Sequence, residues 1–175
     1  YKGRKALMKD AIKEHYERKY SYESNSTLIE SVPITNIPIN RHEAVVKYFP
    51  RYFNGGKVFE IGAGNGNVAK TLLSAENRIS SYVLCDISLP RIEGLRRNLN
   101  DSRVKVLEGN AENLPASEHN SYDAVIMVAV IEHFIDPLRT MQEIRKLLKP
   151  GGIVYIDTPN IAKYTQRMML LLGRF

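Results

Sequence analysis

The chain of 175 residues has the length of one globular domain, and 43% of its residues are hydrophobic. No apolar stretch reaches the roughly 18 residues that suggest a membrane span, and the basic residues behind the net charge of +6 are scattered, so a nucleic-acid partner is not favoured. Cys85 is the only cysteine, which excludes an intrachain disulfide; because the first residues also lack a signal-like apolar core, we expect a cytoplasmic protein.

The N-terminal residues precede the regular alternation of strands and helices. Apolar residues at positions 7, 8, 11, 12, 16 and 20 predict an amphipathic helix over residues 4–20. A polar loop with two prolines follows over residues 21–38. Asn40 is a candidate cap for a helix from Arg41 to Phe49, which leads into the first predicted strand.

A glycine-rich turn follows the short apolar strand predicted at residues 58–61. Its glycines stand at alternate positions: Gly62, Gly64 and Gly66. Glycine lets a ligand approach bare backbone, and the helix predicted after the turn offers unpaired N–H groups. A dinucleotide fingerprint would need glycine at position 67, where the chain has Asn67, and the carboxylate of Glu60 would repel a pyrophosphate. The turn therefore favours a cationic ligand, with a tight turn that binds nothing as the alternative.

Two further strands end in polar residues. Residues 81–86 predict a second strand that ends at Asp86, about twenty residues after the glycines, where nucleotide-binding folds place a carboxylate for the ribose hydroxyls. By itself Asp86 could also cap a helix or close a turn. Residues 104–107 predict a third strand, and residues 109–115 a loop that could be an ordinary Asn/Gly turn.

The second half of the chain continues the alternation. The apolar run Ala124–Val128 is typical of a central strand covered on both faces. Asp136 and Pro137 predict a helix start, followed by a helix from Leu138 to Leu148. This helix is expected to stop at Lys149–Gly152, before a fifth strand at residues 153–157.

Taken together, residues 41–160 resemble the class I S-adenosylmethionine (SAM)-dependent methyltransferases of the type-11 group. The family motif acid-x-Gly-x-Gly-x-Gly matches Glu60 to Gly66, and Lys149–Gly152 matches a second family signature. The resemblance implies an α/β fold, a three-layer Rossmann-like sandwich with a mainly parallel sheet. Its strands, near residues 104, 82, 58, 124 and 153, should lie in the order 3-2-1-4-5.

The resemblance also implies that SAM is the cofactor. Asp86 would hold its ribose, Ile87 would pack on its adenine, and Asn110 stands where many family members have an acid that reads the adenine. Val130 would lie beside the methionine end together with its two preceding residues. The residues that the resemblance assigns to the cofactor are Glu60, Gly62, Ala63, Gly64, Gly66, Asp86, Ile87, Asn110, Ala111, Glu112, Val128 and Ala129.

A catalytic residue is less well defined by the family pattern. His133 and Glu132 follow the fourth strand and are the first candidates for a general base, although both could simply hydrogen-bond a helix start. In the quinone O-methyltransferase branch an acid associated with a divalent metal stands at the position of Ala129. Its absence here argues against that metal, and we expect no metal site.

The family pattern divides the chain into three parts. Residues 1–39 are expected to form a helix and a lid-like segment, where Tyr16, Tyr20 and Tyr22 are either lid or packing residues. Residues 40–160 are the expected SAM-binding domain. Residues 161–175, with the apolar run Met168–Leu172, would begin a C-terminal part whose usual strands are missing. We therefore expect a piece of a longer protein, or residues that are absent from the chain.

Three functions remain open from the sequence. The favoured one is methyl transfer from SAM to a small-molecule or lipid-like acceptor. The alternative is a SAM-binding partner or regulatory protein without transfer activity of its own. A nicotinamide-dependent oxidoreductase is disfavoured by Glu60 and Asn67.

Overall fold

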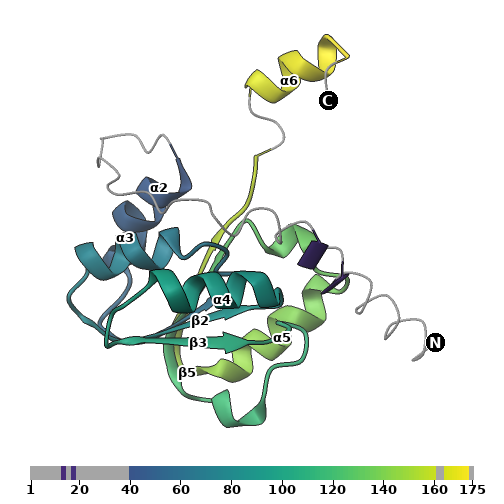
Figure 1. The fold of residues 1–175 in the computed structure, drawn as a ribbon. Helices are drawn as coiled ribbons and strands as arrows, with labels where there is room; N and C mark the ends of the chain where they lie inside the picture. The colour runs from purple at the N-terminus through teal and green to yellow at the C-terminus, as the bar shows by residue number, and fades with distance from the viewer. Residues whose placement is uncertain (1–12, 15–16, 19–39, 161–163, 174–175) are drawn as a thin grey trace.

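The computed structural model describes residues 13–14, 17–18, 40–160 and 164–173 (Figure 1). In the order of the chain, its elements are α2 (Arg41–Tyr48), η1 (Phe49–Arg51), β1 (Gly56–Ile61), α3 (Asn67–Ala75), β2 (Ile79–Asp86), α4 (Leu89–Asn98), β3 (Val104–Glu108), η2 (Ala116–Glu118), β4 (Tyr122–Val128), η3 (Ile131–His133), α5 (Pro137–Leu147), β5 (Leu148–Asp157) and α6 (Tyr164–Leu171). Helices and strands alternate from α2 to β5, as the sequence predicts.

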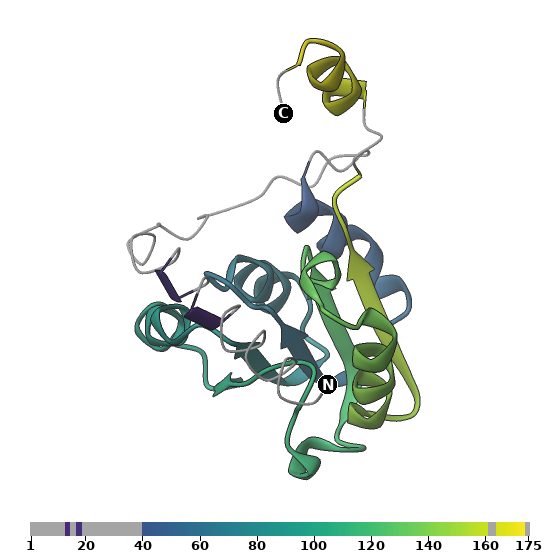
Figure 2. The same ribbon diagram turned by 90° about the vertical axis from the view of Figure 1, so that its right-hand side faces the viewer.

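The five strands form one parallel sheet in the order β3-β2-β1-β4-β5, which confirms the predicted fold class and strand order. The chain moves outward from β1 to β3 in one direction, and then returns to place β4 on the other side of β1. Helices α2, α3 and α4 cover one face of the sheet and α5 covers the other (Figures 1 and 2). The reversal beside β1 creates a crevice at the carboxyl ends of the strands, where such folds bind ligands.

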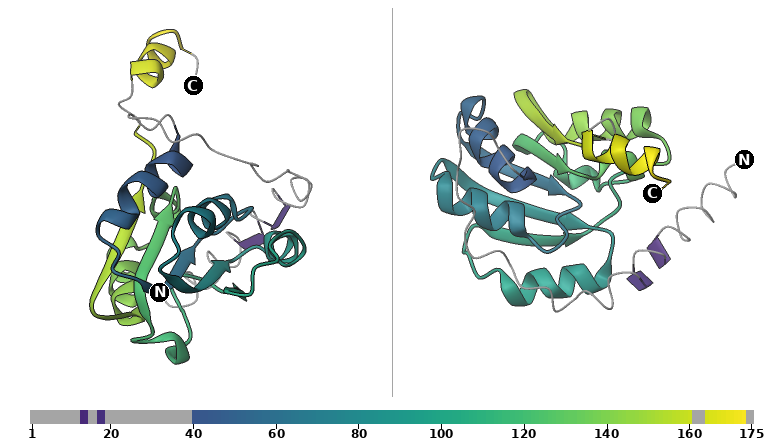
Figure 3. Two further views of the ribbon diagram at one scale, coloured as in Figure 1. Left: turned by 90° about the vertical axis from the view of Figure 1, so that its left-hand side faces the viewer. Right: turned by 90° about the horizontal axis from the view of Figure 1, so that it is seen from above.

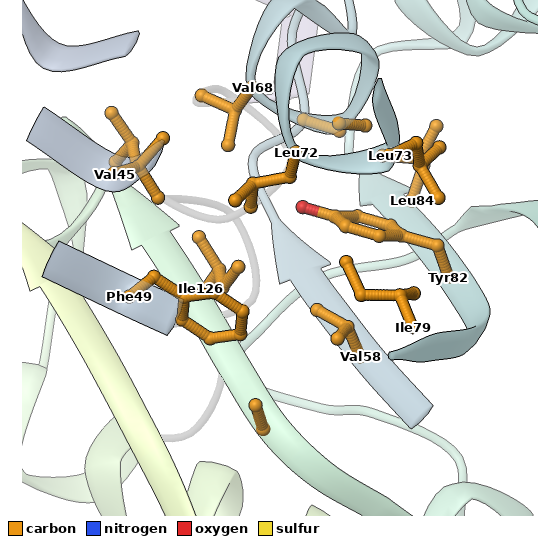
Figure 4. Close-up of a cluster of buried hydrophobic side chains, with 14 of the residues drawn as sticks. Val45, Phe49, Val58, Val68, Leu72, Leu73, Ile79, Tyr82, Leu84 and Ile126 are labelled. Carbon is orange, nitrogen blue, oxygen red and sulfur yellow. The ribbon is translucent and has the colours of Figure 1, made fainter. Parts of the chain in front are cut away.

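Alternation along the strands sends side chains to the two covered faces. Val58, Tyr82 and Ile126 belong to the core under α2, α3 and α4, whereas Phe59 and Val125 belong to the core under α5. Figure 4 shows the first core, in which Leu72 of α3 lies near the hydroxyl end of the Tyr82 side chain. Because helices cover both faces, every residue is buried at positions 58–61 of β1, 82–86 of β2 and 124–128 of β4.

The predicted helix caps are present. The Asn40 side-chain oxygen accepts hydrogen bonds from the backbone N–H groups of His42 and Glu43, at 3.0 and 3.1 Å. The Asp136 carboxylate accepts from the N–H of Arg139 at 3.1 Å, ahead of Pro137 at the first helical position. These bonds satisfy N–H groups that lack a partner within the helix.

The end of α5 differs from the predicted one. The helix ends at Leu147 rather than Leu148, and β5 begins at once, so Lys149–Gly152 lie inside the strand instead of before it. The pairing of β5 with β4 is irregular between Tyr122 and Ala124, and Gly151 has a φ of +79°. An irregular pairing accommodates Pro150 and Gly151, which the propensity of single residues would exclude from a strand.

The two ends of the chain are described in part. Residues 13–14 and 17–18 are helical, and Lys13 forms an ion pair of 2.7 Å with Glu108 at the end of β3, whereas the tyrosines predicted as lid residues lie outside the described part. Helix α6 contains most of the predicted apolar run, and it stands clear of the sheet (Figures 1 and 3) with its side chains from Met168 to Leu171 exposed. No helix in the described ranges is long and apolar enough to span a membrane.

Candidate functional site

A cavity of about 830 Å³, counted with its open mouth, lies at the carboxyl ends of the strands. Its walls come from the ends of β1 and β2 and from the loops that follow β1, β2, β3 and β4. The lining residues are Ile61, Gly62, Gly64, Asp86, Ile87, Gly109, Asn110, Ala111, Glu112, Ala129, Val130, His133, Phe134 and Ile135.

The three glycines of the turn differ in what a side chain at their position would contact. All three have a positive φ, between +56° and +78°. A Cβ on Gly62 would lie 2.4 Å from a methyl of Val130, and a Cβ on Gly66 would lie 2.4 Å from Leu99. A Cβ on Gly64 would meet nothing closer than 3.9 Å. Gly64 therefore presents bare backbone to the cavity, whereas Gly62 and Gly66 leave room for packed side chains of the protein itself.

This difference predicts separate effects of three alanine substitutions. Gly64→Ala should lower the free energy of unfolding by about 1–2 kcal/mol, the cost of a positive φ that all three positions share. Gly62→Ala and Gly66→Ala should each cost about 1–3 kcal/mol more than Gly64→Ala, because the added methyl also collides with a packed side chain. Urea unfolding of the three variants measures this order. A Gly64→Ala loss equal to that of Gly62→Ala would contradict it.

Asp86 stands at the end of β2 with its carboxylate at the cavity wall and 8% of its surface exposed. One carboxylate oxygen accepts from the N–H of Gly64 at 2.9 Å, and the other accepts from the N–H of Ser88 at 2.9 Å. Burial raises the pKa of Asp86, and the two backbone N–H donors together with the charge of Arg91 act in the opposite direction. The carboxylate thus joins the glycine turn to the end of β2 and keeps lone pairs for a ligand.

Glu60 points away from the cavity. Its carboxylate is buried beneath α3 and accepts a hydrogen bond of 2.8 Å from the hydroxyl of Tyr82. Burial raises the pKa of Glu60 to about 8, against the effect of the Tyr82 hydrogen bond and with a smaller contribution from the charge of Asp86. Figure 4 shows the Tyr82 ring crossing this core. The structure therefore explains Glu60 first as part of a buried polar pair, and its predicted contact with the cofactor remains a prediction.

The loop after β3 forms the opposite wall. Asn110, Ala111 and Glu112 line the cavity together with Ile87 from the loop after β2. The side-chain oxygen of Asn110 accepts from the N–H of Glu112 at 2.9 Å, so the amide also shapes its own turn. Both interpretations of this loop from the sequence thus apply: it is an Asn-based turn, and it faces the cavity.

The segment after β4 closes the site beside the glycine turn. Ala129 has a φ of +54°, and its N–H donates to the carbonyl of Asp157 at 2.8 Å. A non-glycine residue in this region is strained, and such strain is typical of functional sites. Val130 and His133 line the cavity, whereas Glu132 is exposed outside the lining. Among the residues that the structure describes, no three His, Cys, Asp or Glu side chains gather as metal ligands would.

Most of the residues assigned to the cofactor thus meet at one cavity, although some do not reach it. Glu60, Ala63, Gly66 and Val128 are not among the residues that line it. Four further lining residues have no motif that assigns them to the cofactor: Ile61, Gly109, Phe134 and Ile135. Their only sequence signal is that each lies at or just after the carboxyl end of a strand that the sequence does predict.

A parallel sheet of this order, with a glycine turn after β1 and a buried acid at the end of β2, defines a Rossmann-like α/β domain. Within that class, the model of the type-11 methyltransferase domain family (Methyltransf_11) matches residues 59–156. The chain belongs to this family. The match begins in β1 and ends in β5, so it contains every element that lines the cavity.

Individual proteins similar to this chain are also named as methyltransferases. The ubiquinone biosynthesis O-methyltransferase of Xanthomonas oryzae pv. oryzae is 28% identical over 109 residues, which cover 61% of this chain and 44% of that protein. A SAM-dependent methyltransferase of Thermotoga maritima, described as a possible histamine N-methyltransferase, matches with a TM-score of 0.58 and 28% identity over 74% of this chain and 57% of that one.

A third relative bears on the ligand. The trans-methyltransferase CalH, solved in complex with S-adenosylhomocysteine (SAH), matches with a TM-score of 0.55 and 26% identity over 64% of this chain and 34% of that one. The present chain spans less than half the length of the ubiquinone relatives it matches.

Proposed function

We propose that the protein transfers a methyl group from SAM to a small-molecule or lipid-like acceptor. The observation that carries this proposal is the pairing of Gly64 and Asp86 at the cavity wall. Bare backbone and a buried carboxylate stand side by side there, joined by a hydrogen bond of 2.9 Å. Membership of the methyltransferase domain family supports the reaction class.

The residues at the cavity fit SAM. Asp86 can accept from two ribose hydroxyls, and Ile87 and Ala111 offer apolar surface to the adenine. Because Gly64 has no Cβ, the methionine portion of SAM can approach the backbone there. A phosphate-bearing dinucleotide fits less well, because Asn67 stands where the dinucleotide fingerprint has its third glycine.

SAM supplies the reactive methyl group on a sulfonium, so the protein needs chiefly to position an acceptor and exclude water. Val130, Phe134 and Ile135 give the cavity an apolar wall that does both. Orientation of this kind lowers a barrier by up to about 7–11 kcal/mol in favourable systems. The acceptor class is proposed from the apolar wall of the cavity and from the ubiquinone-biosynthesis name of the curated relatives.

His133 lines the cavity and is the candidate general base that the sequence indicates. We expect His133→Ala to change the single-turnover rate by less than about tenfold, because an acceptor held in line can react by orientation alone. If His133 is a general base, its removal should lower the transfer rate by about 10²–10⁴-fold and alter the pH profile of the rate. A hundredfold loss with unchanged SAM affinity would therefore make His133 catalytic.

Two measurements test the function itself. Titration calorimetry with SAM, SAH and NAD should give heat of binding for the first two only. Transfer of a labelled methyl group from SAM should then be assayed over catechols, primary amines and isoprenoid quinols. Binding of SAM without transfer to any acceptor would favour a SAM-binding protein without activity of its own, and binding of NAD alone would overturn the proposal.

A further inference from the structure

We infer that Glu112 is a positioning residue that joins the two loops on either side of the cavity into one wall. This inference rests on the proposed function, because it concerns the same site. One carboxylate oxygen of Glu112 accepts a hydrogen bond of 3.0 Å from the backbone N–H of Ile135. The two residues belong to loops that follow different strands, β3 and β4.

The sheet order places the starts of the two loops far apart. Strands β2 and β1 lie between β3 and β4, so the two loops begin roughly 14 Å apart at the ordinary spacing of parallel strands. Residues 109–112 and 131–135 must therefore cross over the ends of the two central strands to meet. Because Glu112 and Ile135 both line the cavity, their hydrogen bond closes one side of the space above β1 and β2.

Burial makes the contact strong. Glu112 has 8% of its surface exposed, and Ala111 and Leu114 beside it belong to the core that also receives Val130 and Phe134. A buried carboxylate that accepts a backbone N–H forms a stronger hydrogen bond than a neutral pair, and losing it leaves the N–H without its partner. The apolar contacts hold the two loops near each other, and the hydrogen bond sets their register.

Glu112 also connects the two parts of the cavity wall that are expected to face opposite ends of the ligand. The N–H of Glu112 donates to the Asn110 side chain on the adenine side, while its carboxylate holds Ile135, next to Phe134 and His133. A change at Glu112 should therefore move both walls of the cavity together. This arrangement gives Glu112 a role in ligand affinity that does not require it to touch the reacting atoms.

Three variants of the whole chain test this role. Glu112→Ala removes the acceptor oxygen, Glu112→Gln keeps one, and Glu76→Ala is a matched control. Glu76 is a buried carboxylate that accepts from a backbone N–H, that of Arg78 at 2.9 Å, outside the cavity lining. The measurements are SAH affinity by calorimetry, hydrogen exchange at the Ile135 amide by NMR, and the urea midpoint.

We expect Glu112→Ala to weaken SAH binding by about tenfold or more and to speed exchange at Ile135, whereas Glu112→Gln should stay within about threefold of the unsubstituted protein. Glu76→Ala should lower the urea midpoint without changing SAH affinity. Equal SAH affinity in Glu112→Ala, or slow exchange at Ile135 in that variant, would overturn the inference. Absence of SAH binding in the unsubstituted protein would instead count against the proposed function, and the Ile135 exchange would still test the hydrogen bond.

Discussion

Substitution of Asp86 by alanine is expected to weaken SAM binding by roughly 10- to 150-fold, the equivalent of about 1.5–3 kcal/mol for a hydrogen bond to a charged group. The carboxylate stands at the cavity wall, where it can accept from the ribose hydroxyls. It also holds the N–H of Gly64 at 2.9 Å, so its loss would loosen the glycine turn as well. Both effects act on the same ligand and in the same direction.

Titration calorimetry measures this effect directly. Asp86→Asn keeps one acceptor oxygen and should lose less affinity than Asp86→Ala. Asp101→Ala is a matched control, because Asp101 pairs with Arg103 at 2.7 Å outside the cavity lining, and its loss should leave SAM affinity unchanged. Melting curves without ligand must show that each variant is folded. An Asp86→Ala variant that binds SAM as tightly as the unsubstituted protein would remove Asp86 from the ribose role.

Substitution of Glu60 by glutamine is expected to stabilise the protein at alkaline pH by roughly 3–5 kcal/mol, an order-of-magnitude figure from proton linkage. Burial raises the pKa of Glu60 from 4.5 in a free chain to about 8 in the folded protein. The folded state therefore favours the protonated carboxyl. Its contribution to stability is fully present below about pH 4.5 and is lost as the pH rises through about 8.

Glutamine has the shape of the protonated carboxyl and can still accept from the Tyr82 hydroxyl, but it does not titrate. The free energy of unfolding in urea should therefore differ between the two proteins by an amount that grows between about pH 5 and pH 8 and then levels off. Other groups that titrate cancel in this difference. If the free energies of unfolding of the two proteins change with pH in parallel, then Glu60 ionises in the folded protein at the same pH as in the unfolded chain, which would contradict the prediction.

Local patterns in the sequence determined the fold. The apolar runs at β1 and β4, the caps at Asn40 and Asp136, and the alternation of strands with helices predicted a parallel sheet, and the resemblance to the methyltransferase family implied the strand order that the structure has. Each of these signals depends on neighbouring residues or on the rule that crossovers are right-handed. The end of α5 was placed one residue too late, because Pro150 and Gly151 suggested a break that the irregular pairing of β5 accommodates.

The sequence by itself determined which loops form the site, because the loops at the carboxyl ends of predicted parallel strands must share one edge of the sheet. Only the tertiary structure decided what each residue does there. It placed Val130 against Gly62 and left Gly64 open to the cavity, although the three glycines look alike in the sequence. It turned Glu60 toward Tyr82 and joined Glu112 to Ile135. These contacts link residues at least 22 positions apart, and their partners are set by the packing of whole elements.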